Sequence, residues 1–289
     1  MTDLDARLQN LKCQYPEWEP WLSVVQEILR ETADSKWDAV VPLRAGTQLS
    51  KVPLLAEVNV ALEKNSLRAF FERLIRVASQ SGTAKMATLE AALDAKLDIF
   101  TLFRASLHQD GVRLTAIAAA LGVDPEAFQA VAVLLPVPFL QACNRRWARE
   151  IAVSWMEGYC PVCGAWPAFA EARGIERSRY LRCGRCGAEW QTHLLFCPYC
   201  GMTDHKEQLS FVPEISSKSA IDACKRCLGY VKTFTTLQGS LPAKVILDDL
   251  ASVELDVAAA EQGYRRPDGA GYSLNLMVTE SGASRHRFA

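Results

Sequence analysis

Eight of the ten cysteines lie between Cys160 and Cys227, in four pairs with two residues between the partners of each pair. Two intervening residues allow both sulfurs of a pair to bind one tetrahedral ion, and two such pairs complete a closed four-cysteine site. We therefore expect this part of the chain to fold around two metal ions. The expected ligands are Cys160, Cys163, Cys183, Cys186, Cys197, Cys200, Cys224 and Cys227.

The residues around the pairs indicate how they are grouped. Three pairs are followed directly by glycine, at Gly164, Gly187 and Gly201, where a tight turn around the sulfur needs a positive φ; the fourth is followed by Leu228 and then Gly229. Sequential grouping, first with second and third with fourth, gives two modules that each begin with a CP-x-CG sequence, and we favour it. An interleaved grouping uses the same eight ligands and stays open.

The cysteines alone do not identify the metal. A ribbon of this size has too small a core to hold itself together, and structural zinc can supply roughly 10–16 kcal/mol to folding. Four thiolates also bind iron in a one-electron centre of the rubredoxin type, and ligand softness does not separate the two metals. With eight cysteines available, we expect His193 and His205 to be surface residues or neighbours of the ligands.

The chain changes character at Gly158. Before it, apolar residues recur at intervals of three and four, which predicts helices, among them 66–80 and 86–109, with Asp124 as the N-cap of a further helix. After it, short alternating segments such as GAEWQTHLLF predict strands. A helix is predicted again over 243–262. The expected fold class is a mainly helical N-terminal domain followed by small β-rich metal modules in tandem.

Charge argues against a nucleic-acid partner. The 289 residues include 32 Lys+Arg and 33 Asp+Glu, a net charge of -1. Residues 158–236 carry ten Lys+Arg against seven Asp+Glu, or +3, and two four-thiolate centres with divalent ions would bring this module to about -1. The LTAIAAALGVDPEAFQAVAVLL segment mimics half of a helix-turn-helix, but no Lys or Arg lies between Arg113 and Arg145.

Other function classes lack a signal in the sequence. The strongly apolar run Ala130–Leu140 has eleven residues and two prolines, too short for a membrane span. Asp3 and Asp5 stand where a secretory signal would carry basic residues, so we expect a cytoplasmic protein with reduced thiols. We find no catalytic motif and expect neither catalytic nor cofactor-binding residues apart from the metal ligands. Asp249 and Asp256 share one predicted helix face, which is more often solvated than catalytic.

Between Gly158 and Arg266, a set of segments follows one another in a specific order: GYCPVCGAWPAF, RYLRCGRCGAEW, CPYCG, CKRCLGYVKTF, and DDLASVELD with GYRR. In this order the sequence resembles the formate dehydrogenase accessory proteins of the FdhE type. Two departures from the pattern stand out: the tail after Arg266, and HLLF before Cys197 where a basic residue is expected.

The resemblance implies a helical domain over 1–157, rubredoxin-like modules over 158–196 and 197–239, and a C-terminal helix and tail over 240–289. It implies two iron atoms bound by the eight cysteines, and a cytoplasmic, non-enzymatic protein that acts on the catalytic subunit of respiratory formate dehydrogenase before export. It further implies partner contact or packing for Asp248, Asp249, Gly263 and Tyr264. A nucleic-acid-associated zinc ribbon and a free-standing redox enzyme stay as alternatives, and the sequence leaves homo-oligomerisation open.

Overall fold

The computed structural model of the protein describes residues 3–44, 51–56, 58–80, 83–93, 97–212 and 219–281. It divides into two compact units. Unit 1 comprises Met1–Arg44, Glu57–Cys143 and Asn275–Ala289, and unit 2 comprises Ala45–Ala56 and Asn144–Leu274. Each unit therefore combines segments that lie far apart in the sequence.

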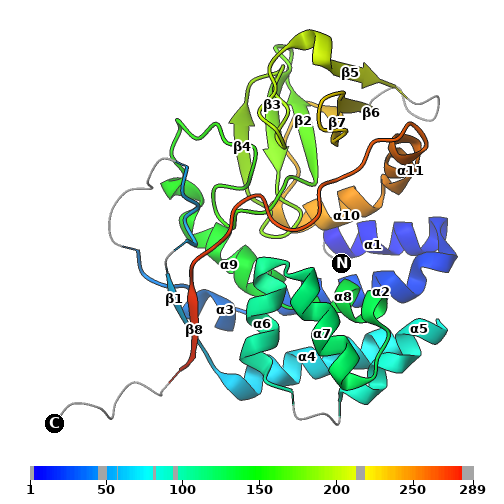
Figure 1. The fold of residues 1–289 in the computed structure, drawn as a ribbon, viewed down its shortest axis with the longest axis vertical. Coiled ribbons are helices and arrows are strands. Elements are labelled where there is room, and N and C mark those ends of the chain that lie inside the picture. Colours follow the sequence, from blue (N-terminus) through cyan, green and yellow to red (C-terminus); the bar gives the residue numbers. More distant parts are fainter. Residues whose placement is uncertain are drawn as a thin grey trace. The chain divides into compact units, whose positions relative to one another are not determined.

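Unit 1 is mainly helical, as the apolar spacing predicts (Figure 1). The predicted N-cap Asp124 is confirmed, since its Oδ1 accepts a hydrogen bond from Ala127 N at 2.9 Å. The α-helices are α1 (Asp3–Gln14), α2 (Glu19–Thr32), α3 (Lys36–Ala39), α4 (Lys64–Ser79), α5 (Ala84–Ala87), α6 (Ile99–His108), α7 (Gly111–Leu121), α8 (Pro125–Ala132) and α9 (Val137–Trp147), the last running into unit 2. Short 3-10 turns are η1 (Pro16–Trp18) and η2 (Thr88–Ala92).

The prediction of one helix over 86–109 is wrong, whereas the prediction over 66–80 is confirmed by α4. The chain forms α5, η2 and α6 instead, because Asp98 starts a new helix by accepting a hydrogen bond from Phe100 N at 3.1 Å. At the end of α6, Gln109 takes the left-handed conformation, with φ 55°. Asp110 then caps α7 through Arg113 N at 2.9 Å.

The core of unit 1 joins α-helices through aromatic pairs and one ion cluster. The rings of Phe71 and Phe128 meet edge to face with centroids 6.5 Å apart. Glu27 and Glu31 of α2 are buried, and both carboxylates contact Arg73 of α4, the first at 3.0 Å. Because these carboxylates are paired, their burial is compatible with a stable core.

The C-terminal tail contributes a strand to unit 1. β8 (Met277–Glu280) pairs in parallel with β1 (Asn59–Leu62), with Val60 opposite Val278. Among the described residues, the helical stretch Pro125–Glu150 is long and apolar enough to cross a membrane by length and composition, with a mean hydropathy of 1.4. Of its most apolar window 72% is buried inside the structure, as in the core helix of a globular protein.

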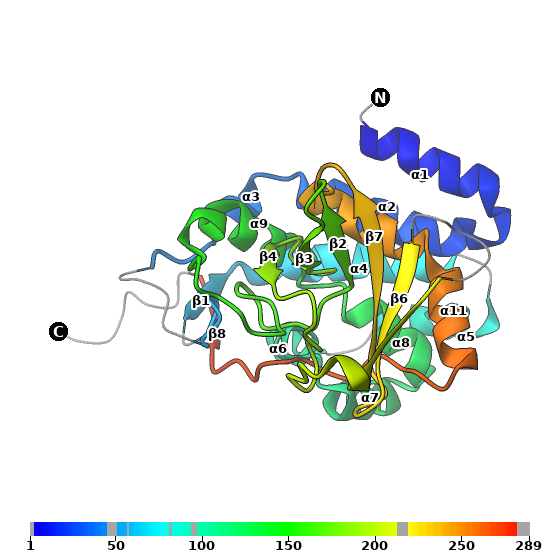
Figure 2. The ribbon, with the colours of Figure 1, turned by 90° about the horizontal axis from the view of Figure 1, so that it is seen from above.

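Unit 2 contains a six-stranded sheet in the order β4-β3-β2-β7-β6-β5. β2 and β7 pair in parallel at its centre, with Phe169 opposite Lys232, and all other neighbours are antiparallel. The strands of the two expected modules thus share one sheet, visible from above in Figure 2. The strands are β2 (Phe169–Arg173), β3 (Ser178–Arg182), β4 (Glu189–Thr192), β5 (Gln208–Phe211), β6 (Ser219–Cys224) and β7 (Tyr230–Thr236).

Helices α10 (Val245–Leu250) and α11 (Val253–Glu261) follow the sheet in the sequence, and α11 packs against β6 and β7. Ile221 and Tyr230 of the sheet form a buried cluster with Leu255 of α11. The described part of unit 2 also contains the 3-10 turns η3 (Ala148–Glu150), η4 (His205–Glu207) and η5 (Pro242–Lys244).

The single helix predicted over 243–262 is wrong, because the chain breaks it between α10 and α11. The hydroxyl of Ser252 donates to the carbonyl oxygens of Asp248 and Asp249 at 2.9 and 3.0 Å. The ammonium group of Lys232 also binds the Asp249 carbonyl oxygen at 2.8 Å. These donors occupy carbonyl groups that a continuous helix would use for its own hydrogen bonds.

Candidate metal centres

All four cysteine pairs adopt the same turn. In the first pair Gly164 N donates to Cys160 O at 2.9 Å, and Cys160 N donates to Ala165 O at 2.8 Å. Equivalent bonds close the turns that begin at Cys183, Cys197 and Cys224. The turn requires a positive φ after the second cysteine: Gly164, Gly187 and Gly201 have φ of 71–74°, and Leu228 takes 57° at the fourth turn.

The turns bring the eight cysteines together in two clusters, grouped sequentially rather than interleaved. Centre 1 consists of Cys160, Cys163, Cys183 and Cys186, and centre 2 of Cys197, Cys200, Cys224 and Cys227. Within each centre the four sulfurs lie within 4.8 Å of one another. All eight residues are free cysteines, without a disulfide.

The sulfur separations match those of a tetrahedral metal site. In centre 1 the Sγ atoms of Cys160 and Cys186 are 3.4 Å apart and those of Cys163 and Cys183 3.5 Å. In centre 2 the corresponding separations are 3.6 and 3.7 Å. Four sulfurs at about 2.3 Å from one ion lie about 3.8 Å from each other, whereas a disulfide would bring two sulfurs to about 2.05 Å. Both centres could therefore hold a metal ion.

The protonation of the thiols supports the same conclusion. Burial raises the pKa of the Cys160 and Cys186 thiols well above the ordinary value. In centre 2, burial raises the pKa of the Cys227 thiol to about 11. Although burial opposes it, hydrogen bonds from the other thiols of centre 1 lower the pKa of the Cys183 thiol, and backbone hydrogen bonds lower the pKa of the Cys224 thiol. Burial opposes ionisation of the Cys160, Cys186 and Cys227 thiols, and a divalent cation bound among the four sulfurs of a centre would stabilise their thiolate forms.

The two centres differ in solvent exposure. In centre 1 the four cysteines are between 0 and 1% exposed. In centre 2, Cys197 and Cys224 are buried, but Cys227 is half-buried and Cys200 is exposed. Centre 1 is therefore closed on all sides, and centre 2 reaches the surface at one edge.

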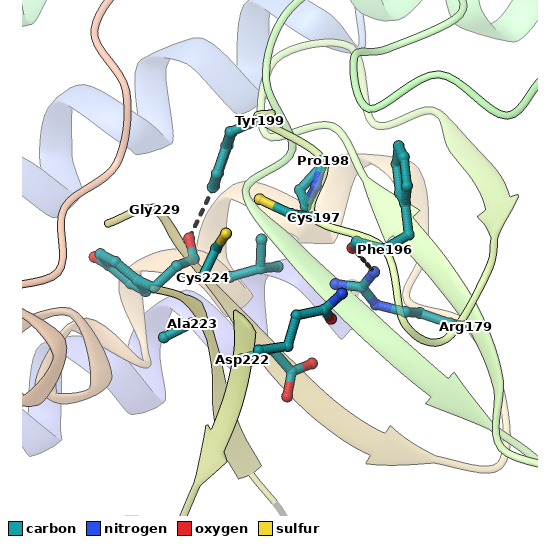
Figure 3. A pocket seen from close by; sticks show the side chains of 12 residues that line it. Arg179, Phe196, Cys197, Pro198, Tyr199, Asp222, Ala223, Cys224 and Gly229 are labelled. Atoms are coloured by element: carbon teal, nitrogen blue, oxygen red, sulfur yellow. Dashed lines mark hydrogen bonds between the residues drawn. The ribbon is translucent and has the colours of Figure 1, made fainter. Parts of the chain in front are cut away.

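The segment before Cys197 is held by a buried arginine. Arg179 of β3 is 4% exposed and donates to the carbonyl oxygen of Phe196 at 2.7 Å (Figure 3). It also donates to the carbonyl oxygen of His193 at 3.5 Å. A small cavity of about 20 Å³, enough for about one water, lies beside Arg179 and is also lined by Cys197 and Asp222.

The two histidines considered as ligands lie outside both clusters, which contain only cysteines among the described residues. His205 is exposed and its ring lies 3.6 Å from Asp204. His193 contributes its backbone carbonyl to Arg179.

The first module carries a run of arginines that the sequence predicts to form a solvated face or to compensate the thiolates: Arg173, Arg177, Arg179, Arg182 and Arg185. Arg177 is exposed, but Arg179 and Arg182 are buried. Arg182 is 1% exposed and pairs at 3.1 Å with Glu171, which is equally buried. Arg173 contacts the same carboxylate, and Arg182 also donates to Gly187 O beside centre 1 at 3.3 Å. Burial would raise the pKa of Glu171, but the nearby arginines lower it below the ordinary value. These charges compensate one another inside the fold.

A second ion cluster, built around the buried Lys232, accounts for part of the late DDLASVELD and GYRR signature. Lys232 is fully buried and contacts Asp249 at 2.7 Å and Asp256 at 3.0 Å. Arg266 contacts both carboxylates at 2.8 Å, and the Tyr230 hydroxyl donates to Asp256 at 2.7 Å. The prediction of a solvated face for Asp249 and Asp256 is therefore wrong, and these residues hold α10 and α11 on the sheet.

The remaining residues of the signature also have structural contacts. Asp248 accepts a hydrogen bond from the Ser240 hydroxyl at 2.7 Å. Gly263 ends α11 with φ 81°, and Tyr264 packs against the cluster of Ile221 and Leu255. All three positions thus serve the packing of unit 2.

Sequence reasoning missed the contacts that join the two centres. The rings of Trp166 and Tyr199 meet edge to face with centroids 5.3 Å apart. A Cβ atom on Gly158 would lie 1.7 Å from Pro198 O, so only glycine allows the first and third turns to pack this closely. Both contacts join residues that lie more than 30 positions apart in the sequence, so no local sequence pattern predicts them.

The fold and the two cysteine clusters define a protein of two units, in which the β-rich unit carries two four-cysteine centres that could each bind a metal ion. Residues 195–278 match the family described as the FdhE C-terminal domain. A protein named FdhE homolog from Aquifex aeolicus is 27% identical over 200 residues, covering 68% of this chain and 66% of that protein. Another, from Pseudomonas aeruginosa, is 35% identical over 130 residues, covering 43% and 40%. These comparisons confirm the resemblance to FdhE-type proteins.

The matched segments span between about two fifths and two thirds of these curated relatives. The crystal structure of the FdhE protein from Pseudomonas aeruginosa covers 93% of this chain and 93% of that chain, with a TM-score of 0.48 and 22% identity.

Proposed function

We propose that the protein is an accessory factor required for the activity of respiratory formate dehydrogenase, and that it carries a metal ion in each four-cysteine centre. The observation that carries the proposal is that the chain combines two four-cysteine clusters with a match to the FdhE C-terminal domain over 195–278. The domain match covers centre 2 directly. Centre 1 repeats the same turn and the same ligand set.

Iron is the metal that we propose, with zinc as the alternative. The eight sulfurs fit either ion, because both accept four thiolates in a tetrahedron. When bound, iron would supply a one-electron centre, and zinc would act in folding alone. The protein residues that would hold the ion are the eight cysteines, with Arg185 near the sulfurs of centre 1 and Arg179 near Cys197 of centre 2 to offset the thiolate charge.

The proposed partner is the catalytic subunit of formate dehydrogenase, contacted in the cytoplasm before export. In this proposal the protein acts through contact and not as an enzyme. Support comes from the family match over 195–278 and from the ion pairs of Asp249 with Lys232 and Arg266, which give these late signature charges a structural role.

The alternative of a nucleic-acid-binding zinc ribbon is disfavoured by burial of the basic residues. Arg179, Arg182 and Lys232 are 4, 1 and 0% exposed, so three of the ten Lys+Arg of residues 158–236 cannot reach phosphates. The surface charge of the module is therefore more acidic than its composition indicates.

Co-purification tests the proposal directly. A tagged copy of the full chain, expressed in a host that makes formate dehydrogenase, is expected to retain the catalytic subunit, and a variant with Cys183→Ser and Cys186→Ser is expected to lose it. Retention of nucleic acid in a salt-sensitive manner, without the catalytic subunit, would favour the zinc-ribbon alternative.

A further inference from the structure

The two centres have different access to solutes. Every cysteine of centre 1 is at most 1% exposed. In centre 2, Cys200 is exposed and Cys227 is half-buried, and the neighbouring Leu228 is 48% exposed. Lys225 and Arg226, between the cysteines of the fourth turn, are exposed at the same edge. A donor atom from outside can approach an ion in centre 2 but not one in centre 1.

The inner side of centre 2 is fixed by packing. Tyr199 lies between Cys197 and Cys200, and its hydroxyl donates to Tyr230 O at 2.9 Å (Figure 3). A Cβ on Gly229 would lie 2.4 Å from Tyr199 Cδ2 and 3.2 Å from Cys227 Sγ, so the ring fills the space beside this sulfur. Because the inner side is held in this way, the turn can keep its conformation when the outer ligand Cys200 leaves an ion.

We propose that centre 2 is a ligand-exchange site at which a thiol from solution or from a partner replaces Cys200, whereas centre 1 is a permanent site. This inference rests on the metal assignment of the proposed function. A bond from the incoming sulfur to the ion forms as the bond to Cys200 Sγ breaks. The proton of the incoming thiol passes through solvent to the released Cys200, so the ion keeps four sulfurs and its charge, and no electron moves.

Alkylation of the metal-loaded full chain tests the difference between the centres. The protein, with its bound metal quantified, is treated with iodoacetamide for increasing times, and the labelled cysteines are identified by mass spectrometry. Cys13 is exposed and belongs to neither centre, so its labelling is set aside. Among the eight ligands we expect Cys200 to be labelled first and Cys227 next, at least about tenfold faster than any cysteine of centre 1, a difference of about 1.4 kcal/mol in opening. The unfolded, metal-free chain is the control and should label all eight cysteines alike.

A matched pair of variants tests the exchange itself. Cys200→Ser and Cys163→Ser both replace the second cysteine of a CP-x-CG sequence, the first at the exposed edge and the second in the closed centre. With 2-mercaptoethanol added, Cys200→Ser is expected to regain the second ion, because an added thiolate can fill the vacated position. Cys163→Ser is expected to gain nothing from the thiol.

Several outcomes would overturn the inference. Equal labelling of both centres, or faster labelling of centre 1, would show that exposure of Cys200 does not control access. Failure of 2-mercaptoethanol to restore the ion in Cys200→Ser, or equal rescue of both variants, would contradict exchange at this position. Each of these results, obtained with two ions bound to the wild type, leaves the metal assignment intact, whereas a chain that binds no metal contradicts both.

Discussion

Lys232 offers the sharpest test of what holds unit 2 together. Its ammonium group is fully buried and contacts the carboxylates of Asp249 and Asp256, which are 28 and 26% exposed. Lys232→Met keeps most of the side-chain volume but removes the charge. In the wild type the charges of Lys232 and Arg266 balance those of Asp249 and Asp256. In the variant, Arg266 is the remaining cation of the cluster, and it contacts both carboxylates.

Removing one partner of a buried ion pair costs about 3–5 kcal/mol, and the partial exposure of both carboxylates favours the lower end, about 3 kcal/mol. At a urea slope of about 3 kcal/mol per molar, the unfolding midpoint should fall by about 1 M. The assay is urea unfolding of metal-loaded protein followed by circular dichroism. Arg265→Met is the control, since Arg265 is exposed next to Arg266 and its loss should leave the midpoint unchanged.

The double variant Lys232→Met with Asp249→Asn separates charge from packing. Neutralising Asp249 leaves Asp256 and Arg266 as a balanced pair of charges. The double variant should therefore lose less unfolding free energy than the two single variants lose together, by about 1 kcal/mol or more. Strict additivity, or a Lys232→Met midpoint within error of the wild type, would refute the role given to this ion cluster.

Three further predictions concern pH, packing and metal content. Burial would raise the pKa of Asp249, but Arg266 and Lys232 lower it below 3.8. The ionised carboxylate therefore stabilises the fold above about pH 4, and this stabilisation is lost as the pH falls further. Between pH 6 and pH 3 the urea midpoint of Asp249→Asn should fall less steeply than the midpoint of the wild type. Gly158→Ala places a Cβ 1.7 Å from Pro198 O and should lower the midpoint by an amount equivalent to about 2 kcal/mol; an unchanged midpoint would contradict the close contact of the two turns. Replacing Cys183 and Cys186 together by serine should reduce bound metal from two ions to one, measured by elemental analysis, and full metal content would contradict the ligand set.

The ligand set of the site could be predicted from the sequence because it is encoded locally. Two residues between cysteines and a glycine after them define a turn that needs no information from the rest of the chain. For the same reason the left-handed conformations of Gly164, Gly187 and Gly201 follow directly from the pattern. Sequential grouping was favoured by the repeated CP-x-CG and is what the structure has.

The features that the sequence did not reveal depend on contacts between distant residues. The parallel pair of β2 and β7 joins the two modules in one sheet. Because parallel strands are not connected by a tight turn, no hairpin pattern in the sequence predicts this pair. Asp249 and Asp256 look solvated in a helical pattern, because their buried partner Lys232 lies on another strand. The breaks after η2 and at Ser252 arise from caps and carbonyl contacts that override helical spacing.

Formate-dependent dye reduction in a host that lacks this gene, compared with the same host carrying it, tests the central claim most directly. The account predicts that activity is lost without the gene although the formate dehydrogenase polypeptide is still made. It further predicts that the wild-type chain restores the activity and that the variant with Cys183→Ser and Cys186→Ser does not. Unchanged formate-dependent activity in the host without the gene would contradict the role that we propose for this protein in formate dehydrogenase maturation.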